Sequence, residues 1–172
     1  INTNVLRNAR HYDANVTGML LKINNRKNLY SVTTSAFMSA KLHPGQDADR
    51  GYAANIEFGK TGGNFRVVGY GNLKTDRFDN NDMGLQFITN FTESGISLAY
   101  NVYTPFWKLN NCFNRVKIVY QRMYKQNAFW NFGIYGNSVT TFRKKFITYG
   151  IDYGFEPVIT YDYYEPRNMD RF

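Results

Sequence analysis

The chain has 172 residues, with 21 Lys and Arg against 13 Asp and Glu, which gives a formal charge of +8. Its single cysteine excludes a disulfide framework and a cysteine-based metal centre, and no apolar run approaches the roughly 18 residues of a membrane-spanning helix. Phe and Tyr occur 14 times each, while the mean hydropathy is −0.50, a value that a sheet with one apolar and one wet face can show.

Apolar and polar residues alternate along most of the chain, and this period of two is typical of β-strands. Residues 1–11 lack the alternation and are expected to form a loop. The rest of the chain predicts about nine strands, at residues 12–20, 29–42, 52–58, 65–73, 85–91, 96–102, 116–124, 128–136 and 146–155. All of them can connect as neighbouring antiparallel hairpins.

The first and last predicted strands show what each face should carry. The apolar face of the first is expected to hold Tyr12, Ala14, Val16, Gly18 and Leu20. The last strand has the clearest alternation, with Thr, Gly and Asp on its second face. Its apolar face holds Ile147, Tyr149, Ile151, Tyr153 and Phe155.

The expected connections differ in length. Short turns are predicted at 24–27, 60–64, 92–95 and 125–127, and long loops at 43–50, 74–82 and 104–114. Outer-membrane barrels have short periplasmic turns and longer outer loops, and their strands need 9–11 residues to cross a bilayer at a tilt. We therefore expect an all-β fold, an antiparallel up-and-down transmembrane β-barrel with lipid outside and a polar lumen. A soluble sheet with its apolar face turned inward shows the same period and is the alternative.

Residues 1–172 are expected to form one domain, the C-terminal portion of a larger barrel. If the turn at 24–27 is periplasmic, the first strand starts at the outer face, whereas complete barrels usually start and end in the periplasm. Nine strands is also an odd number, whereas bacterial single-chain barrels have even numbers. Further strands are therefore expected before Tyr12.

Three stretches together carry a family resemblance. Residues 59–65 read Gly-Lys-Thr-Gly-Gly-Asn-Phe, and residues 79–85 read Asp-Asn-Asn-Asp-Met-Gly-Leu. Residues 160–167 read Thr-Tyr-Asp-Tyr-Tyr-Glu-Pro-Arg and form the most specific of the three motifs. In this order and spacing the chain, over residues 12–172, resembles the C-terminal region of domain-of-unknown-function family 5916.

The resemblance implies an outer-membrane barrel of Bacteroidota. Members of that family often carry an N-terminal domain similar to a family 9 carbohydrate-binding module, and they are often labelled membrane-associated hydrolases. The carbohydrate-binding domain lies outside this sequence, so sugar binding cannot be assigned to these residues. The hydrolase label brings no catalytic residue that can be carried over to this chain.

The predicted loop at 74–82 is rich in side-chain oxygens. Its carboxylates Asp76, Asp79 and Asp82 are candidate ligands for Ca²⁺, which prefers oxygen. The spacing differs from the EF-hand pattern, and clusters of Asn and Asp are also ordinary turn chemistry. No cofactor is expected.

Four polar residues are expected to face the lumen: Glu57, Asn131, Asn137 and Asp152. Paired carboxylates can hydrolyse glycosides, and the candidates for such a pair are Glu57, Glu93, Asp152 and Glu156. The two expected in the lumen, Glu57 and Asp152, are far apart in strand order. Such residues also pair with lumen Arg and Lys, so no catalytic residue is predicted.

Aromatic residues can form girdles at the two bilayer interfaces. The same residues would suit the core of a soluble sheet. The candidates for the girdles are Tyr12, Trp107, Trp130, Tyr149, Tyr153 and Phe155.

The expected role is structural or in transport, as a pore or as an anchor in an envelope complex. The expected partners are outer-membrane lipid and lipopolysaccharide, because a basic surface attracts acidic headgroups. Other envelope proteins, in a complex, are further candidate partners. The basic residues are spread out, which argues against nucleic acid. The alternatives are a glycan hydrolase or carbohydrate-binding protein, from the family label, and a soluble β-sandwich that binds acidic ligands.

Overall fold

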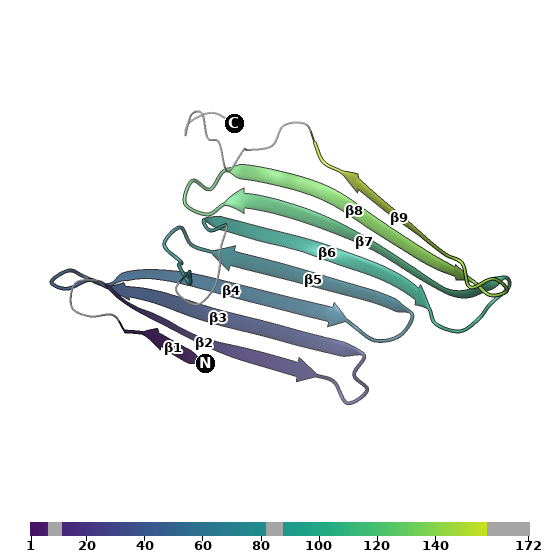
Figure 1. Cartoon of the computed structure of the whole chain (residues 1–172), viewed down its shortest axis with the longest axis horizontal. Coiled ribbons are helices and arrows are strands. Elements are labelled where there is room, and N and C mark those ends of the chain that lie inside the picture. Colours follow the sequence, from purple (N-terminus) through teal and green to yellow (C-terminus); the bar gives the residue numbers. More distant parts are fainter. Residues whose placement is uncertain (7–11, 82–87, 158–172) are drawn as a thin grey trace.

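The computed structural model describes residues 1–6, 12–81 and 88–157. They form a nine-stranded antiparallel sheet in which each strand pairs with its neighbours in sequence (Figure 1). The strands are β1 (Asn2–Val5), β2 (Asp13–Asn24), β3 (Tyr30–Leu42), β4 (Asp49–Lys60), β5 (Phe65–Lys74), β6 (Phe91–Val102), β7 (Leu109–Met123), β8 (Phe129–Phe142) and β9 (Thr148–Phe155).

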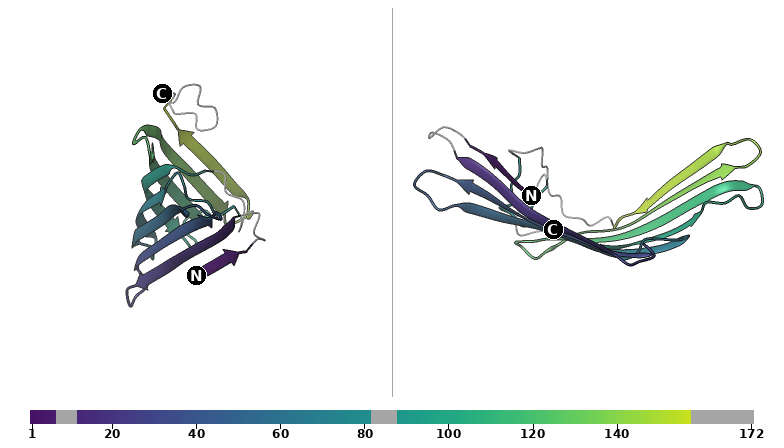
Figure 2. Two further views of the ribbon diagram at one scale, coloured as in Figure 1. Left: turned by 90° about the vertical axis from the view of Figure 1, so that its left-hand side faces the viewer. Right: turned by 90° about the horizontal axis from the view of Figure 1, so that it is seen from below.

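The sheet is open and bent into a trough. Its two edges are β1 and β9, which do not pair with each other in the part of the chain that the structure describes. Figure 2 shows the bend of the sheet. The predicted all-β, up-and-down antiparallel fold is confirmed, but this sheet does not close on itself.

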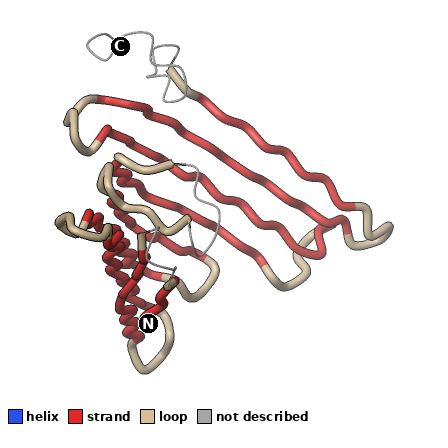
Figure 3. Tube along the Cα trace, turned by 60° about the vertical axis from the view of Figure 1, so that its left-hand side comes forward, coloured by secondary structure: helices blue, strands red, loops and turns tan. Residues whose placement is uncertain are grey.

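The connections divide between the two ends of the sheet, as the tube in Figure 3 shows. One end, called the short-turn end, holds 25–29, 61–64, 103–108 and 143–147. The opposite end, called the loop end, holds 43–48, 75–90 and 124–128, of which 75–90 is the longest.

The predicted alternation of short turns and long loops is wrong at two places. The loop expected at 104–114 is shorter, because β7 already begins at Leu109. It lies at the short-turn end, because residues 92–95 continue β6 and form no turn. The register between β7 and β8 is irregular between Leu109 and Asn111. The short turn at 125–127 lies at the loop end.

The strand prediction differs from the structure near both of the gaps in the description. β1 lies where a loop was expected. Of the strand predicted at 85–91, residues 88–90 are not in a strand and Phe91 begins β6, while residues 85–87 lie outside the described part. The turn predicted at 92–95 is wrong, because these residues belong to β6. Glu93 pairs with Asn72 on β5, and Gly95 pairs with Tyr70, so small and polar residues continue a strand there.

The predicted apolar face of the first strand is also wrong. Val16 pairs with Ser39 on β3, and both lie on the concave, polar face. The apolar face of β2 belongs instead to Met19, Leu21 and Ile23, which are exposed. Leu20 and Leu21 are adjacent, so the sequence offers both phases, and only the pairing with β3 decides between them.

A single sheet buries few side chains. Among the described residues, Phe78 in the connection 75–90 is one of the best buried, at 5% exposure. Its backbone lies against Gly51 of β4, where a Cβ would come within 2.1 Å of the Phe78 nitrogen. The glycine therefore lets this segment lie directly on the concave face.

Candidate functional site: the two faces of the sheet

The convex face is apolar and uncovered. Directly opposed residues of antiparallel strands share a face, and the pairs Ile96–Ile118 and Ile118–Ile134 run across β6, β7 and β8. On other strands, Ile56 is 47% exposed and Ile151 is 65% exposed. No second layer covers these side chains within residues 1–6, 12–81 and 88–157. The arrangement presents a broad hydrocarbon surface to its surroundings.

Aromatic side chains form two rows on this face. Tyr52 and Phe58 lie six positions apart on β4, which is about 20 Å of strand at roughly 3.3 Å per residue. Aliphatic side chains such as Ile56 lie between them. The row near the short-turn end holds Tyr30, Phe58, Phe65, Tyr100 and Tyr149, and the row near the loop end holds Tyr52, Tyr120 and Phe129, all exposed.

The structure places the predicted interface aromatics in different settings. Tyr149, Tyr153 and Phe155 lie on the convex face of β9, where they are at least half exposed. The Trp130 ring contacts Phe91, a concave-face residue, with 6.0 Å between centroids.

The other two predicted interface aromatics lie in connections. Trp107 lies in the connection 103–108 and is 78% exposed. Tyr12 precedes β2 and its ring lies 5.3 Å from that of His43. The aromatic rows themselves were not predicted, because they become visible only once the strands are in register.

The concave face carries a polar row that runs straight across five strands, from β4 to β8. Asn55 donates to Asn72 at 2.6 Å, and Asn72 donates to Glu93 at 3.3 Å. Gln121 donates to the other Glu93 oxygen at 2.6 Å. Asn131 pairs with Gln121 and completes the row.

A tyrosine and a lysine lie beside this row. Lys117 Nζ lies 3.9 Å from Glu93 Oε1 and 4.7 Å from the centroid of the Tyr70 ring. The Tyr70 ring crosses over Gly95, where a Cβ would meet the hydroxyl at 2.4 Å. The glycine thus allows the ring to lie flat over the neighbouring strand.

The four predicted lumen residues share the concave face. Asn137 donates to Asp152 at 2.6 Å, and Glu57 and Asn131 lie on β4 and β8. Five strand spacings separate Glu57 from Asp152, roughly 24 Å along the sheet. This exceeds the separation of a glycosidase acid pair, about 5–9.5 Å, so the two carboxylates do not form such a pair.

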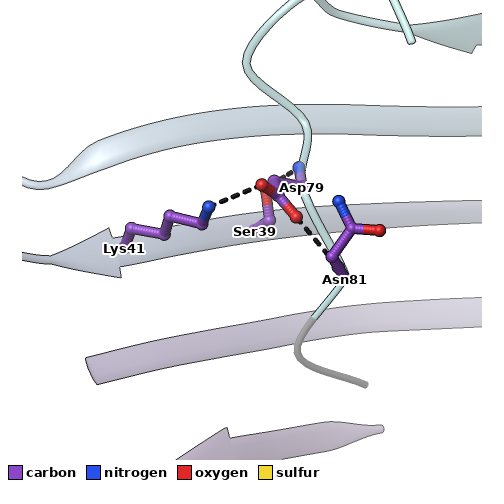
Figure 4. Close-up of polar contacts among 4 residues, drawn as sticks. All are labelled: Ser39, Lys41, Asp79 and Asn81. Atoms are coloured by element: carbon purple, nitrogen blue, oxygen red, sulfur yellow. Dashed lines mark hydrogen bonds and ion pairs between the residues drawn. The ribbon is translucent and has the colours of Figure 1, made fainter. Parts of the chain in front are cut away.

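The connection 75–90 is anchored on the concave face at the loop end (Figure 4). Lys41 Nζ lies 2.5 Å from Asp79 Oδ2, and the Asp79 N–H donates to Ser39 Oγ at 3.0 Å. The Asn81 N–H donates to Asp79 Oδ1 at 2.8 Å. On the far side, Asn90 accepts from Lys125 N at 2.9 Å.

The candidate Ca²⁺ ligands are paired with lysines. Lys125 Nζ lies 3.0 Å from Asp76 Oδ2, and this bond holds the pKa of Asp76 below its ordinary value. Burial acts to raise the pKa of Asp79, but hydrogen bonds from Lys41 and Asn81 outweigh it and lower that pKa. Within the described residues no group of three or more His, Cys, Asp or Glu side chains gathers as a metal site, and Asp82 lies outside them.

A family model described as a domain of unknown function, DUF5916, matches residues 1–172. The chain belongs to the DUF5916 family. No curated protein and no solved structure matches it significantly.

Two of the three DUF5916 motifs fall wholly or partly within the described residues. The motif at 59–65 forms the tight connection between β4 and β5, where Gly63 has a φ of +81° that favours glycine. The motif at 79–85 begins with Asp79, the anchor of the connection 75–90, and the rest from Asp82 lies outside the described part. The motif at 160–167 also lies outside it.

Proposed function

We propose that this DUF5916 chain forms part of the wall of a transmembrane β-barrel in a Gram-negative outer membrane. Its convex face contacts lipid, and its concave face lines a polar lumen. The supporting observation is the uncovered apolar face, which spans the sheet from Met19 on β2 to Ile151 on β9. An exposed apolar patch larger than a few hundred Å² marks a membrane or partner surface.

Strand length and the aromatic rows support the same proposal. Strands β2 to β8 have 10 to 15 residues, which meets the roughly 9–11 that a bilayer crossing at a tilt requires. Aromatic rows that flank an aliphatic band match the girdles of such barrels. None of the described residues forms a helix able to span a membrane.

Closure is part of the proposal. In hydrocarbon, each unpaired backbone group costs several kcal/mol, so an open sheet edge is not stable there. β1 and β9 therefore pair with further strands in the membrane. The two edges of the trough supply the free backbone groups for that pairing.

The proposed role is a pore or an anchor within an envelope complex. The lumen side offers Asn, Gln, Glu and Lys side chains, which select solutes by size and charge. Asp79 of the connection 75–90 is bound on the same side, at the loop end.

The two alternatives have less support. A soluble β-sandwich requires a second layer over Ile56, Ile96 and Ile151, and the described residues provide none. A glycan hydrolase with paired carboxylates would need two that converge, and Glu57 and Asp152, the two expected to face the lumen, lie on strands β4 and β9.

Cell fractionation and electrophoresis test the proposal. The full-length protein should be recovered in the outer-membrane fraction, should need detergent for extraction, and should migrate differently before and after heating. Single-channel conductance in a planar bilayer would distinguish an open pore from a plugged anchor. Extraction in buffer without detergent, with no heat-dependent shift, would contradict the membrane assignment.

A further inference from the structure

The two ends of the sheet differ in charge. The connections at the loop end contain both acids and bases, namely Asp47, Asp76, Arg77, Asp79 and Lys125 among the described residues. The four connections at the short-turn end contain no Asp or Glu. Their charged residues are Arg26, Lys27, Lys108, Arg143, Lys144 and Lys145.

Four of these cations surround one cavity. The connections 103–108 and 143–147 lie side by side, joined by a 2.9 Å bond from Arg143 N to the Lys108 carbonyl. The cavity at these connections has a volume of about 880 Å³, and Lys108 and residues 143–145 are among its lining residues. No carboxylate among the described residues forms an ion pair with these four cations. Their combined charge favours an anionic ligand.

The same cavity continues into an apolar groove. Trp107, Phe142 and Tyr149 line the charged cavity and also a second one of about 580 Å³. The second cavity extends to Leu109 and Ile151 on the convex face. A ligand that fills both must carry an anionic head and a hydrocarbon tail.

The backbone holds aromatic side chains outward at this site. Trp107 has a φ of +47° and Phe146 a φ of +50°, a left-handed conformation that is unusual for bulky residues. Their side chains are 78% and 71% exposed. Reciprocal bonds between Phe106 and Leu109, at 3.0 and 2.9 Å, fix the turn that carries Trp107. Exposed aromatics beside cations are typical of the membrane interface.

We propose that Lys108 and residues 143–145 bind the phosphate of an anionic glycerophospholipid, with one acyl chain along Trp107, Tyr149 and Ile151. The inference rests on the proposed membrane function. Short turns face the periplasm in outer-membrane barrels, which places the site in the leaflet that contains glycerophospholipid. Inorganic phosphate lacks the tail that the groove accepts.

Photo-crosslinking tests the site in the full-length protein. A benzophenone-bearing phenylalanine replaces Trp107, and the protein is reconstituted in mixed phosphatidylcholine and phosphatidylglycerol bilayers. Mass spectrometry then identifies the crosslinked lipid. We expect phosphatidylglycerol to exceed its share of the bilayer by about fivefold or more, since each surface cation contributes on that order. The triple variant Arg143→Gln, Lys144→Gln, Lys145→Gln should return the ratio to the bilayer share.

Two controls separate the possible outcomes. The double variant Arg26→Gln, Lys27→Gln removes charge from the same end of the sheet but from another connection, and should keep the preference. The same probe at Ile96, on the convex face, should crosslink lipid without headgroup preference. Crosslinking at 96 but none at 107, or no preference at 107, would overturn this inference alone.

Two further crosslinking results would overturn either the class of lipid or the membrane function itself. A stronger preference for lipid A added to the bilayer than for phosphatidylglycerol would overturn the assignment to glycerophospholipid. Absence of lipid crosslinking at both 96 and 107 would contradict the proposed membrane function as well.

Discussion

Lys41 Nζ lies 2.5 Å from Asp79 Oδ2 and ties the connection 75–90 to strand β3. We expect Asp79→Asn to weaken this anchoring by about 1 kcal/mol, because a charge-assisted hydrogen bond becomes a neutral one. Hydrogen exchange at the amides of Phe78 and Asp79 should then be about fivefold faster. The control is Asp49→Asn, because Asp49 lies 3.7 Å from Arg77 in an exposed pair, which is worth little. Equal effects of the two changes would contradict the anchoring role.

The same anchor should depend on pH. The pKa of Asp79 in the folded chain lies below its ordinary value of 3.8, so its contribution is fully present above that value. It is lost as pH falls through the lowered pKa. The protection factor of the Phe78 amide, which is its intrinsic exchange rate at each pH divided by the observed rate, should therefore be constant from about pH 5 upward and should fall below about pH 4. A fall in protection that begins near neutral pH would point to another group.

The contact between Tyr70 and Gly95 predicts a site-specific loss of stability. In Gly95→Ala the new methyl would lie 2.4 Å from both the Ile118 carbonyl oxygen and the Tyr70 hydroxyl. We expect a cost of about 1–3 kcal/mol, typical of overpacking. Gly71→Ala is the matched control, since its nearest neighbour would be Ile56 Cγ2 at 3.5 Å, an ordinary contact. Urea unfolding, followed by the heat-dependent gel shift, should separate the two variants.

An arginine introduced at two adjacent positions of β4 should change the stability of the inserted protein by very different amounts. Ile56 lies on the convex face and Glu57 on the concave face. Ile56→Arg should destabilise the inserted protein by about 2–4 kcal/mol, as at the lipid-facing midplane of a barrel. Glu57→Arg should have little effect on stability. Similar losses for both variants, measured by unfolding from bilayers, would argue against lipid on the convex face.

Much of the fold could be predicted from the sequence because a period of two survives in most strands. The alternation at 147–155 corresponds to β9, and the strands predicted at 52–58 and 96–102 lie within β4 and β6. The prediction failed where composition imitates a turn, as at 92–95, or where both phases are apolar, as at Leu20 and Leu21. Tertiary pairing decided these positions.

The two candidate sites could be predicted far less well. The row from Asn55 to Asn131 exists only through the register of five strands. The cationic cavity joins Lys108 to residues 143–145, which are separated by β7 and β8. Sequence alternation carries no information about register, so these assemblies required the structure.

A spin-label scan of β4 tests the central claim most directly. Labels placed singly at residues 52–58 of the protein in bilayers are compared for collision with oxygen, which concentrates in lipid, and with a polar nickel chelate. We predict maximal oxygen collision at Tyr52, Ala54, Ile56 and Phe58, and maximal nickel collision at Ala53, Asn55 and Glu57. Nickel collision at Ile56 equal to that at Glu57, or immobilisation of the Ile56 label beneath another protein layer, would contradict lipid on the convex face.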